Sequence, residues 1–459
     1  MATQDPSTQA VISALGSGQS FGASVDKETG SIPTPAVQAA LAAIRAQDEM
    51  NRTELVNTVE FSYSSDIMQL GDPFSVVIPN PRGKYTNQFT RGQKVELSLK
   101  NPNVNGGQPT LKQRGVIVRR HQSTSSSGGS VIRLDCADLG WHLANNDAWL
   151  FYKLQGKPFS DLLQDPKFID PSWGLTGLTT DRETTNLLKR GVNNGRAQYQ
   201  LDLLALGTLV YLQIEPGDKV ADIISTYARR INRLVNVGAD GKLILWNPNY
   251  SKSALYHIEL HDIDEMGGPG NPNNVIDAAI DEDITSIHTE VTCIGEIVGA
   301  TLAPDVTDQN AAKRRGTFAN AYALPFLHRL NFADGDIYAK NSAQKQAQWK
   351  YNRGIFDSWQ AVYVVRGHHQ GSEWWESDQM CTVNDTLHGI SGAMYVSSVR
   401  YDRDSRGDRT TVTLRKPGLL QAAFGVLPMA PRLPGSVLDS SGTATSTPTT
   451  TAVTKPQRS

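Results

Sequence analysis

The clearest pattern of apolar and polar positions lies between residues 359 and 417. Apolar residues alternate over 359–366, which places every second side chain on one face of a strand. Residues 380–383 predict a second strand, and residues 393–401 and 410–415, rich in Val, Thr and Tyr, predict a β-hairpin around a polar turn. This part of the chain therefore predicts a sheet with a partly wetted surface, suited to holding the edge of another chain.

Short strands are also predicted throughout residues 56–139. Alternation or apolar runs, separated by clusters of Gly, Pro, Asn and Ser, occur at residues 59–63, 74–78, 95–99, 116–118 and 131–136. Several short strands at this spacing are typical of a small antiparallel barrel or sandwich. The polar segments 101–109 and 123–130 are expected to be exposed loops.

Helical periodicity is strongest in the middle of the chain. Apolar residues from Val220 to Val235 cover one helical face, and Gly238 stands where a C′ glycine would end the helix. The dipeptide at 240–241 would then turn the chain into a strand at residues 243–246. A helix that returns at once into a strand predicts an α+β unit.

Two further helices and a strand-rich run are predicted. Residues 34–44, opened by a Thr-Pro pair, predict a short helix that packs either on its own domain or on a neighbouring subunit. Strands are expected to resume in the Val-, Ile- and Thr-rich residues 284–297. Residues 336–353 predict a helix with an alanine stripe, which Gly354 would end.

Length and composition indicate a globular protein of several domains. The 459 residues exceed what one core usually supports, and 39% hydrophobic with 20% charged residues is ordinary. A net charge of −2 argues against nucleic-acid binding, no apolar window is long enough to span a membrane, and the N-terminus lacks a secretory signal. Cys136, Cys293 and Cys381 are too far apart for a zinc site or redox pair and are interpreted as buried thiols.

The predicted fold class is α+β, mainly β, with two similar small antiparallel β-barrel domains. The predicted parts are an N-terminal arm with a short helix (1–55), a first β-barrel (56–139), an α+β middle domain (140–282), a second β-barrel with a helical insertion (283–417) and a largely disordered C-terminal extension (418–459). Residues 1–33 and the Pro-, Ser- and Thr-rich tail have too little apolar surface to form a core. They are expected to be flexible unless a partner orders them.

Signals of catalysis are weak. The sequence lacks a Gly-x-Ser-x-Gly elbow, a P-loop and a His-Glu-x-x-His motif. His368 and His369, beside Glu373 and Glu376, come nearest to a metal cluster, but adjacent residues on a strand face opposite sides and cannot share an ion there. We therefore predict no catalytic residue, no cofactor and no metal site.

Two runs of charged residues are interpreted as solvent-exposed segments without a functional role. Asp281, Glu282 and Asp283 are interpreted as a solvated turn rather than a general acid pair. The triplet Lys313-Arg314-Arg315 is interpreted as a solvated loop rather than an interface anchor.

Aromatic residues leave two readings open. Trp374 and Trp375 could stack on a sugar ring or anchor a protein interface, and we favour the interface. Residues 215–218, Glu-Pro-Gly-Asp, resemble the opening of a LysM peptidoglycan-binding module, but the second half of that module has no counterpart after Gly238.

A series of short motifs follows in a fixed order from residue 289 to residue 417. They are Thr289-Glu290-Val291-Thr292-Cys293-Ile294-Gly295, a helix ending near Trp349 and Arg353, Val364-Val365-Arg366-Gly367, Trp374 or Trp375, Val383-Asn384-Asp385, Gly389-Ile390, Met394-Tyr395-Val396-Ser397-Ser398-Val399, and Thr410-Thr411-Val412-Thr413-Leu414 with Pro417. In order and spacing they resemble the baseplate hub family of contractile-tailed bacteriophages, which includes the Mu-type tail protein and, more distantly, the T4-type hub. Residues 56–246 agree with this family in element order, whereas the N-terminal arm, the insertion at 301–320 and the C-terminal tail depart from it.

The resemblance implies a structural protein without catalysis. It implies a homotrimer whose six barrels form a pseudo-sixfold ring, with tail tube proteins on one side and a threefold central spike protein on the other. It also implies a place in the virion tail baseplate after assembly in the host cytoplasm, and it leaves open contacts with a peripheral baseplate or tape-measure protein. The alternatives are a peptidoglycan- or glycan-binding tail protein that uses Trp374, Trp375 and residues 215–237, and a cell-wall hydrolase, for which no acid and nucleophile can be named.

Overall fold

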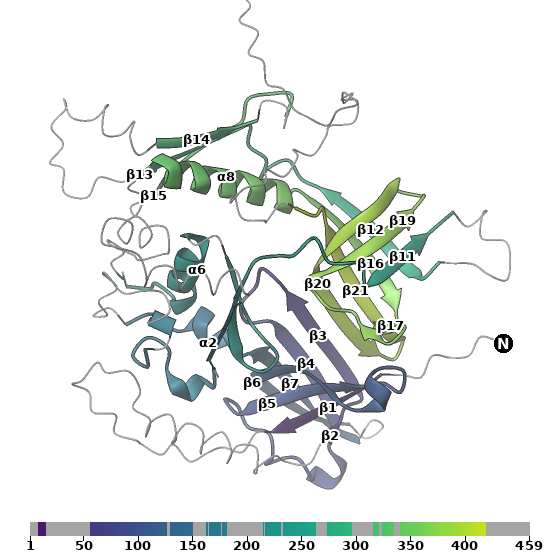
Figure 1. The fold of residues 1–459 in the computed structure, drawn as a ribbon. Helices are drawn as coiled ribbons and strands as arrows, with labels where there is room; N and C mark the ends of the chain where they lie inside the picture. The colour runs from purple at the N-terminus through teal and green to yellow at the C-terminus, as the bar shows by residue number, and fades with distance from the viewer. Residues whose placement is uncertain are drawn as a thin grey trace, which may run out of the picture.

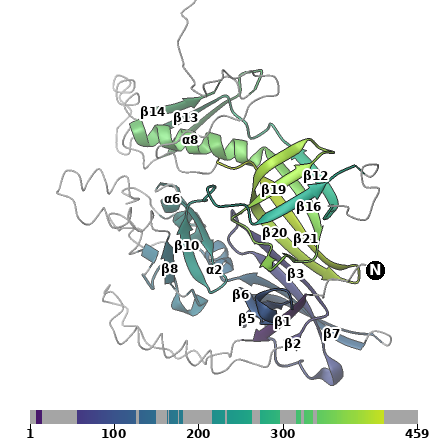
Figure 2. The same cartoon turned by 45° about the vertical axis from the view of Figure 1, so that its right-hand side comes forward.

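A large curved sheet dominates the fold, with two three-stranded sheets and a two-stranded sheet besides it among the described residues (Figures 1 and 2). The computed structural model describes residues 8–14, 56–125, 129–149, 162–163, 165–175, 177–180, 214, 216–230, 233–262, 273–295, 315–320, 324–334 and 340–418. Among these residues, no helix is both long enough and apolar enough to cross a membrane. The protein is mainly β, as predicted.

The large sheet contains thirteen of the described strands. Its main path runs in the order β12 (Val275–Glu282), β16 (Trp359–Arg366), β21 (Gly407–Arg415), β20 (Ile390–Asp404), β3 (Glu60–Asp66), β4 (Pro73–Pro79), β7 (Gly129–Asp138), β6 (Thr110–Ser125), β5 (Lys94–Lys100), β1 (Gln9–Ala14) and β2 (Val56–Asn57), with β19 (Gln379–Asp385) on β20 and β11 (Tyr256–Leu260) on β19. The strands predicted at residues 59–136 and 359–415 are thereby confirmed. The short strands β17 (His369–Gln370) and β18 (Glu373–Trp374) pair with each other.

The sheet contains the same five-strand arrangement twice. The first module is β3-β4-β7-β6-β5 and the second module is β12-β16-β21-β20-β19, and every neighbouring pair within each is antiparallel. The long hairpin of each module has a register shift at the same place, after Ile117 in β6 and after Val396 in β20. Seven residues then separate the shift from the turn in both β6 and β20.

A backbone hydrogen bond recurs at this shift. The amide of Gly92 donates to the carbonyl of Ile117 at 2.8 Å, and the amide of Asp378 donates to the carbonyl of Val396 at 2.9 Å. Both donors have positive φ, 79° for Gly92 and 60° for Asp378. The two modules therefore share their turn geometry as well as their strand order.

The two modules are joined edge to edge by one pair of strands. Strand β3 pairs antiparallel with the second half of β20, from Phe61 opposite Arg403 to Asp66 opposite Ser398. We call this pairing the intramolecular seam. Inward-facing residues from both modules form one core across it, with Tyr63 and Tyr401 in edge-to-face contact at 5.5 Å between ring centroids.

The expectation of two closed barrels is not confirmed: among the described strands, the path of the large sheet has free ends. Each module nevertheless curves back toward its first strand. Strand β1 bridges β5 and β2, which leads into β3, and the backbone amide of Asn274, just before β12, donates to the carbonyl of Glu259 on β11 at 3.3 Å. Strands β11 and β12, which precede the predicted boundary at residue 283, pair with β19 and β16 of the second module.

Part of the expected flexible arm is a strand. Residues Gln9–Ala14 form β1, which pairs antiparallel with β5, and Ala10 and Ile12 are buried in the core. In the second module, β11 occupies the corresponding place on β19 but runs parallel to it. The arm is therefore ordered at this point by its own chain, because β5 offers it an unpaired edge.

A smaller α+β unit packs beside the first module. It combines a sheet of β8 (Gly177–Thr180), β10 (Lys242–Trp246) and β9 (Leu234–Val237) with α2 (Gly140–Asn145), α6 (Val220–Arg230) and a separate apolar core. The helix predicted from Val220 is present but ends by Arg230, and residues 234–235 belong to β9. Gly238 is therefore not a helix cap: it begins the turn of a β-hairpin, in which the amide of Gly241 donates to its carbonyl at 2.8 Å.

The insertion in the second module forms a third unit. Strands β14 (Arg315–Ala319), β13 (Glu290–Gly295) and β15 (Arg329–Asp334) make a sheet against which α8 (Lys340–Asp357) packs through Ala343, Ala347 and Tyr351 (Figure 1). Gly354 does not end α8, which continues to Asp357. A Cβ at Gly354 would lie 2.1 Å from the carbonyl oxygen of Ser286, so glycine here allows a close approach rather than a helix stop.

The strands predicted at residues 284–297 are confirmed only in part, and two other predicted segments lie outside the described residues. Residues 284–287 form a turn, and within 284–297 a strand is described only at β13. Short 3₁₀ turns lie at η1 (Pro81–Gly83), η2 (Asn105–Gly107) and η3 (Pro171–Trp173), and residues 162–163 are helical. The helix predicted at 34–44 and the C-terminal tail after residue 418 lie outside the described residues.

Candidate functional site

The structure does not bring His368 and His369 together as a metal site, because His368 is buried in the core. His368 is fully buried, and its Nδ1 lies 3.1 Å from the hydroxyl of Thr410, while its ring stacks on that of Tyr401. His369 faces the other way, toward the carbonyl of Gly371. His368 lies in the bend between β16 and β17 and His369 begins β17, and the two rings have different partners. Among the described residues, no group of three or more His, Cys, Asp or Glu side chains could hold a metal ion.

Burial of His368 makes stability depend on pH. Transfer out of water lowers the pKa of this imidazole to about 3. The unfolded chain binds a proton below about pH 6.5 and the folded chain does not, so stability present at neutral pH is lost on acidification. Between pH 7 and pH 4 this side chain should account for about 3 kcal/mol of that loss.

His368→Gln is expected to flatten the dependence by this amount, because glutamine stays neutral and can still bond to Thr410. Urea denaturation midpoints of wild type and variant at pH 7 and pH 4 measure the difference. Equal shifts of the midpoint in the two proteins would refute the assignment.

Both tryptophans belong to the protein's own core. Trp374 is 6% exposed and Trp375 is 2% exposed, which corrects the expectation of an interface anchor. The ring of Trp375 packs on that of Tyr256, with centroids 4.3 Å apart, and its carbonyl accepts a hydrogen bond from the hydroxyl of Tyr401. Trp374 lies under the ammonium of Lys112, which is 5.1 Å from the ring centroid. Neither ring is available to a sugar or to another chain.

The remaining candidates are spread over separate elements. Asp281 and Glu282 are exposed at the end of β12 rather than in a turn, and Asp283 follows them, accepting hydrogen bonds from Thr285. Arg315 begins β14, whereas the rest of the basic triplet and Glu215 lie outside the described residues. All three cysteines are buried thiols outside any disulfide, as predicted.

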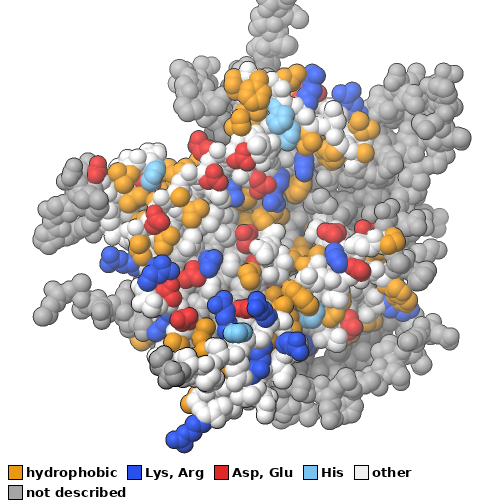
Figure 3. All heavy atoms as spheres, turned by 180° about the vertical axis from the view of Figure 1, so that it is seen from behind, with side chains coloured by type: hydrophobic (Ala, Val, Ile, Leu, Met, Phe, Trp, Pro, Cys, Tyr) orange, Lys and Arg blue, Asp and Glu red, His pale blue; other side chains and the backbone are white. Residues whose placement is uncertain are grey.

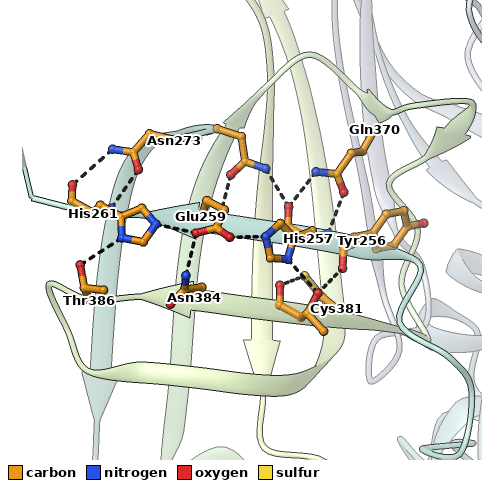
Figure 4. A network of polar contacts seen from close by, with 11 residues as sticks. Tyr256, His257, Glu259, His261, Asn273, Gln370, Cys381, Asn384 and Thr386 are labelled. Carbon is orange, nitrogen blue, oxygen red and sulfur yellow. Dashed lines mark hydrogen bonds and ion pairs between the residues drawn. The ribbon is translucent and has the colours of Figure 1, made fainter. Parts of the chain in front are cut away.

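A polar network on β11 was not predicted from the sequence (Figure 4). His257, Glu259 and His261 alternate along the chain and project from one face. The carboxylate of Glu259 is paired with Nε2 of His257 and with Nε2 of His261, the latter at 2.6 Å, and it accepts from the amide of Asn384 at 3.0 Å. The period-two spacing of these residues is the signal that could have revealed it.

This network holds β11 in place. Burial opposes ionisation of Glu259, but the hydrogen bonds from the two histidines outweigh it and lower the pKa of the carboxyl. Nδ1 of His257 lies 2.9 Å from the hydroxyl of Thr382 on β19, and the side-chain amide of Asn274 donates from Nδ2 to the carbonyl of His257 at 2.7 Å. Since the contacts with Thr382, Asn384 and Asn274 join β11 to neighbouring segments, the network fastens the added parallel strand to the sheet.

Exposed strand edges at the ends of the modules are the surfaces left without a described partner. A row of free backbone donors and acceptors is a template for another strand.

Comparison with solved structures identifies the fold as that of phage tail proteins. The tail protein of Neisseria meningitidis aligns with a TM-score of 0.61 at 18% identity, over 80% of this chain and 95% of that chain. The 43 kDa tail protein of prophage MuSo2 from Shewanella oneidensis aligns with a TM-score of 0.59 at 14% identity, over 90% of this chain and 100% of that chain.

Part of the sequence also matches the model of a known protein family. Residues 339–422 match the fourth domain of the Mu phage baseplate assembly protein GpP. This match covers α8 and most of the second module, where the sequence motifs lie, and it confirms the resemblance to Mu-type baseplate proteins. No curated protein matches the chain. The chain is thus related to structural proteins of the phage tail and baseplate.

Proposed function

We propose that this chain is the structural hub of a contractile phage tail. Three copies form a ring of six β modules, which seats a sixfold tail tube on one side and a threefold central spike on the other. The proposal places the protein in the tail baseplate of the virion, and the role requires no catalysis. The fold and the family match over residues 339–422 support it.

One observation carries the proposal: the same five-strand arrangement occurs twice in one chain. A sixfold partner needs six equivalent seats, and a threefold partner needs three. Three copies of a chain with two such arrangements supply both numbers. The intramolecular seam also gives the two modules of each copy a fixed relation, because strand pairing sets their register.

Light scattering coupled to size-exclusion chromatography tests the assembly. We expect a mass close to three times the 50.1 kDa of the chain. Negative-stain images of the same fractions should show rings with threefold features, and addition of tail tube protein should cap them on one side. A monomer at micromolar concentration that retains neither tube nor spike protein would refute the proposal.

The alternatives lack a supporting observation. The glycan-binding reading depended on Trp374 and Trp375, whose rings are buried in the core. Of the LysM-like segment, the described residues form the turn before α6 and the helix itself. For a hydrolase, the sequence suggests no acid and nucleophile.

A further inference from the structure

Within the two modules, two stretches of strand edge have no described partner. Strand β12 ends the path of the large sheet and pairs along its length with β16, while only Asn274, just before it, reaches β11 through a backbone hydrogen bond to Glu259 at 3.3 Å. The second half of β6, residues 119–125, pairs only with β7, because β5 reaches no further than Val116. Both edges are solvent-exposed over most of their length.

The intramolecular seam shows what such a pair of edges does. In the second module, the half of β20 beyond the register shift is covered by β3 of the first module. By strand order and register, β6 corresponds to β20 and β12 corresponds to β3. The two free edges are therefore the counterparts of the two edges that form the seam.

The correspondence fixes a register. Ser398 and Arg119 each follow the shift, and Asp66 and Asp283 occupy matching places relative to β4 and β16. Because Ser398 lies opposite Asp66 in the seam, Arg119 would lie opposite Asp283. Six strands separate β12 from β6 along the sheet path of one copy, so we assign the partner edge to a second copy.

We propose that β12 of one copy pairs antiparallel with residues 119–124 of β6 in a second copy, repeating the intramolecular seam between subunits. The inference rests on the proposed trimer and specifies its interface. The contact is heterologous, so that each copy gives one edge and receives the other. Three such contacts and three intramolecular seams would join the six modules into one continuous sheet.

Charge complementarity supports this register independently. It places two arginines and a histidine opposite three consecutive carboxylates, in the pairs Arg119–Asp283, Arg120–Glu282 and His121–Asp281. Opposite charges directly across an antiparallel pair are favourable, and they suppress other registers. Lys and Arg side chains gather on the lower half of the face shown in Figure 3, at the height of the first module, with several carboxylates above them.

Exposed apolar residues fall in matching places. Val118 is 44% exposed and Ile284 is 53% exposed. Their counterparts in the seam are Ser397 and Ile67, where the amide of Ile67 donates to the carbonyl of Ser397 at 3.1 Å and Ile67 is 2% exposed. Pairing between copies would bury Ile284 in the same way.

The loop beside β6 leaves the edge accessible. Arg120 donates to the carbonyl of Thr86 at 2.7 Å, so residues 81–90 lie over one face of the strand. In the second module the corresponding loop lies over β20 through the contact of Tyr401 with Trp375, and β3 still pairs with the edge. A loop in this position is therefore compatible with an added strand.

Engineered disulfides test the register. Ser123 and Ala279 are small, exposed and predicted to face each other between copies. In a chain carrying both Ser123→Cys and Ala279→Cys, mild oxidation should give covalent dimers and trimers on non-reducing gels. The matched control is Ser62→Cys with Asp402→Cys, the counterpart pair across the seam, which should close within one chain and leave its mass unchanged.

A slipped pair provides the negative control. Ser123→Cys with Ala278→Cys puts the two thiols on opposite faces of the sheet, because a shift of one residue reverses the side chains. It should give no covalent trimer under the same oxidation. Equal yields from the slipped and the in-register pairs would overturn the proposed register.

Charge reversal tests the same surface without cysteines. Asp281→Lys with Glu282→Lys should weaken the trimer by roughly tenfold or more, since both positions would face cations. Asp277→Lys on the same strand faces no charged residue in this register and should leave the trimer intact. Adding His121→Glu to Asp281→Lys should restore the assembly that Asp281→Lys alone weakens.

The outcomes separate this inference from the proposed function. A wild-type trimer that gives no in-register cross-link and tolerates the charge reversal would refute the β6–β12 contact and leave the hub intact. A wild-type monomer refutes both. Trimer formation together with in-register cross-linking and the charge rescue supports both.

Discussion

Gly115→Ala is expected to destabilise the first module by at least about 3 kcal/mol. Gly115 lies in β6, where a Cβ would be 2.2 Å from the carbonyl oxygen of Ala137 and 2.6 Å from Cε1 of Phe74. The oxygen belongs to the neighbouring strand β7 and cannot move without breaking the ladder. Thermal denaturation should show a correspondingly large fall in melting temperature.

Two further variants test the cause of this effect. Gly238→Ala adds a Cβ that meets only side-chain atoms, the nearest being Cδ1 of Ile244 at 3.0 Å, and should cost less than about 1 kcal/mol. Adding Phe74→Leu to Gly115→Ala should recover little, because the backbone contact remains. Wild-type stability of Gly115→Ala would show that β6 and β7 are further apart than described.

Arg415→Met should cost about 3 kcal/mol. Nη1 of Arg415 donates to the carbonyls of Phe356, Asp357 and Trp359 at 2.8 to 3.0 Å, and Nη2 donates to Gln360 at 2.9 Å. These carbonyls lie at and just beyond the C-terminus of α8, where a cation is favoured and orphan acceptors need donors. Methionine fills similar space but leaves the carbonyls without these donors.

Hydrogen exchange locates the effect of this change. Amides at the end of α8 and the start of β16 should lose protection in Arg415→Met, together with a fall in melting temperature. Arg400→Met removes an ion pair with Asp402 in which the arginine is 60% exposed, and should change stability by less than about 0.5 kcal/mol. If the two variants behave alike, Arg415 does not cap the helix.

Local pattern was enough to predict the strands. Residues 74–79 and 361–366 have identical alternation of buried and less buried positions, and this alternation is visible in the sequence. It reflects one face on the core and one on solvent, which any amphipathic strand must satisfy.

Pairing partners could not be read from the sequence in the same way. Residues 9–14 form a strand only because β5 offers an edge, and their own Gln- and Ser-containing segment carries little strand signal. The seam joins residues more than 330 positions apart, from Asp66 to Ser398. Alternation says which face a residue occupies, but not which strand lies beside it.

The structural equivalence of the two modules is not visible in the sequence, because matching core positions carry different residue types. The matched register puts Gly115 where the second module has Met394, and Phe74 where it has Ala361. In the first module the small residue is on β6 and the large one on β4, whereas in the second module the large residue is on β20 and the small one on β16. The packed volume is therefore similar although the residue types differ. Trp374 and Trp375 misled for a related reason, since aromatic residues serve cores and interfaces alike.

The seam also sets an order of events during synthesis. Strand β3 leaves the ribosome long before residues 398–403 exist, and translation of the intervening chain takes roughly 20 to 60 s at common rates. Throughout that interval its edge can pair with the β20 of a completed neighbour on the same messenger. Strand exchange between nascent chains is therefore the misassembly to which this architecture is most exposed. It would give interlocked subunits in which β3 of one chain pairs with β20 of another, through the same contacts that form the seam within a native subunit.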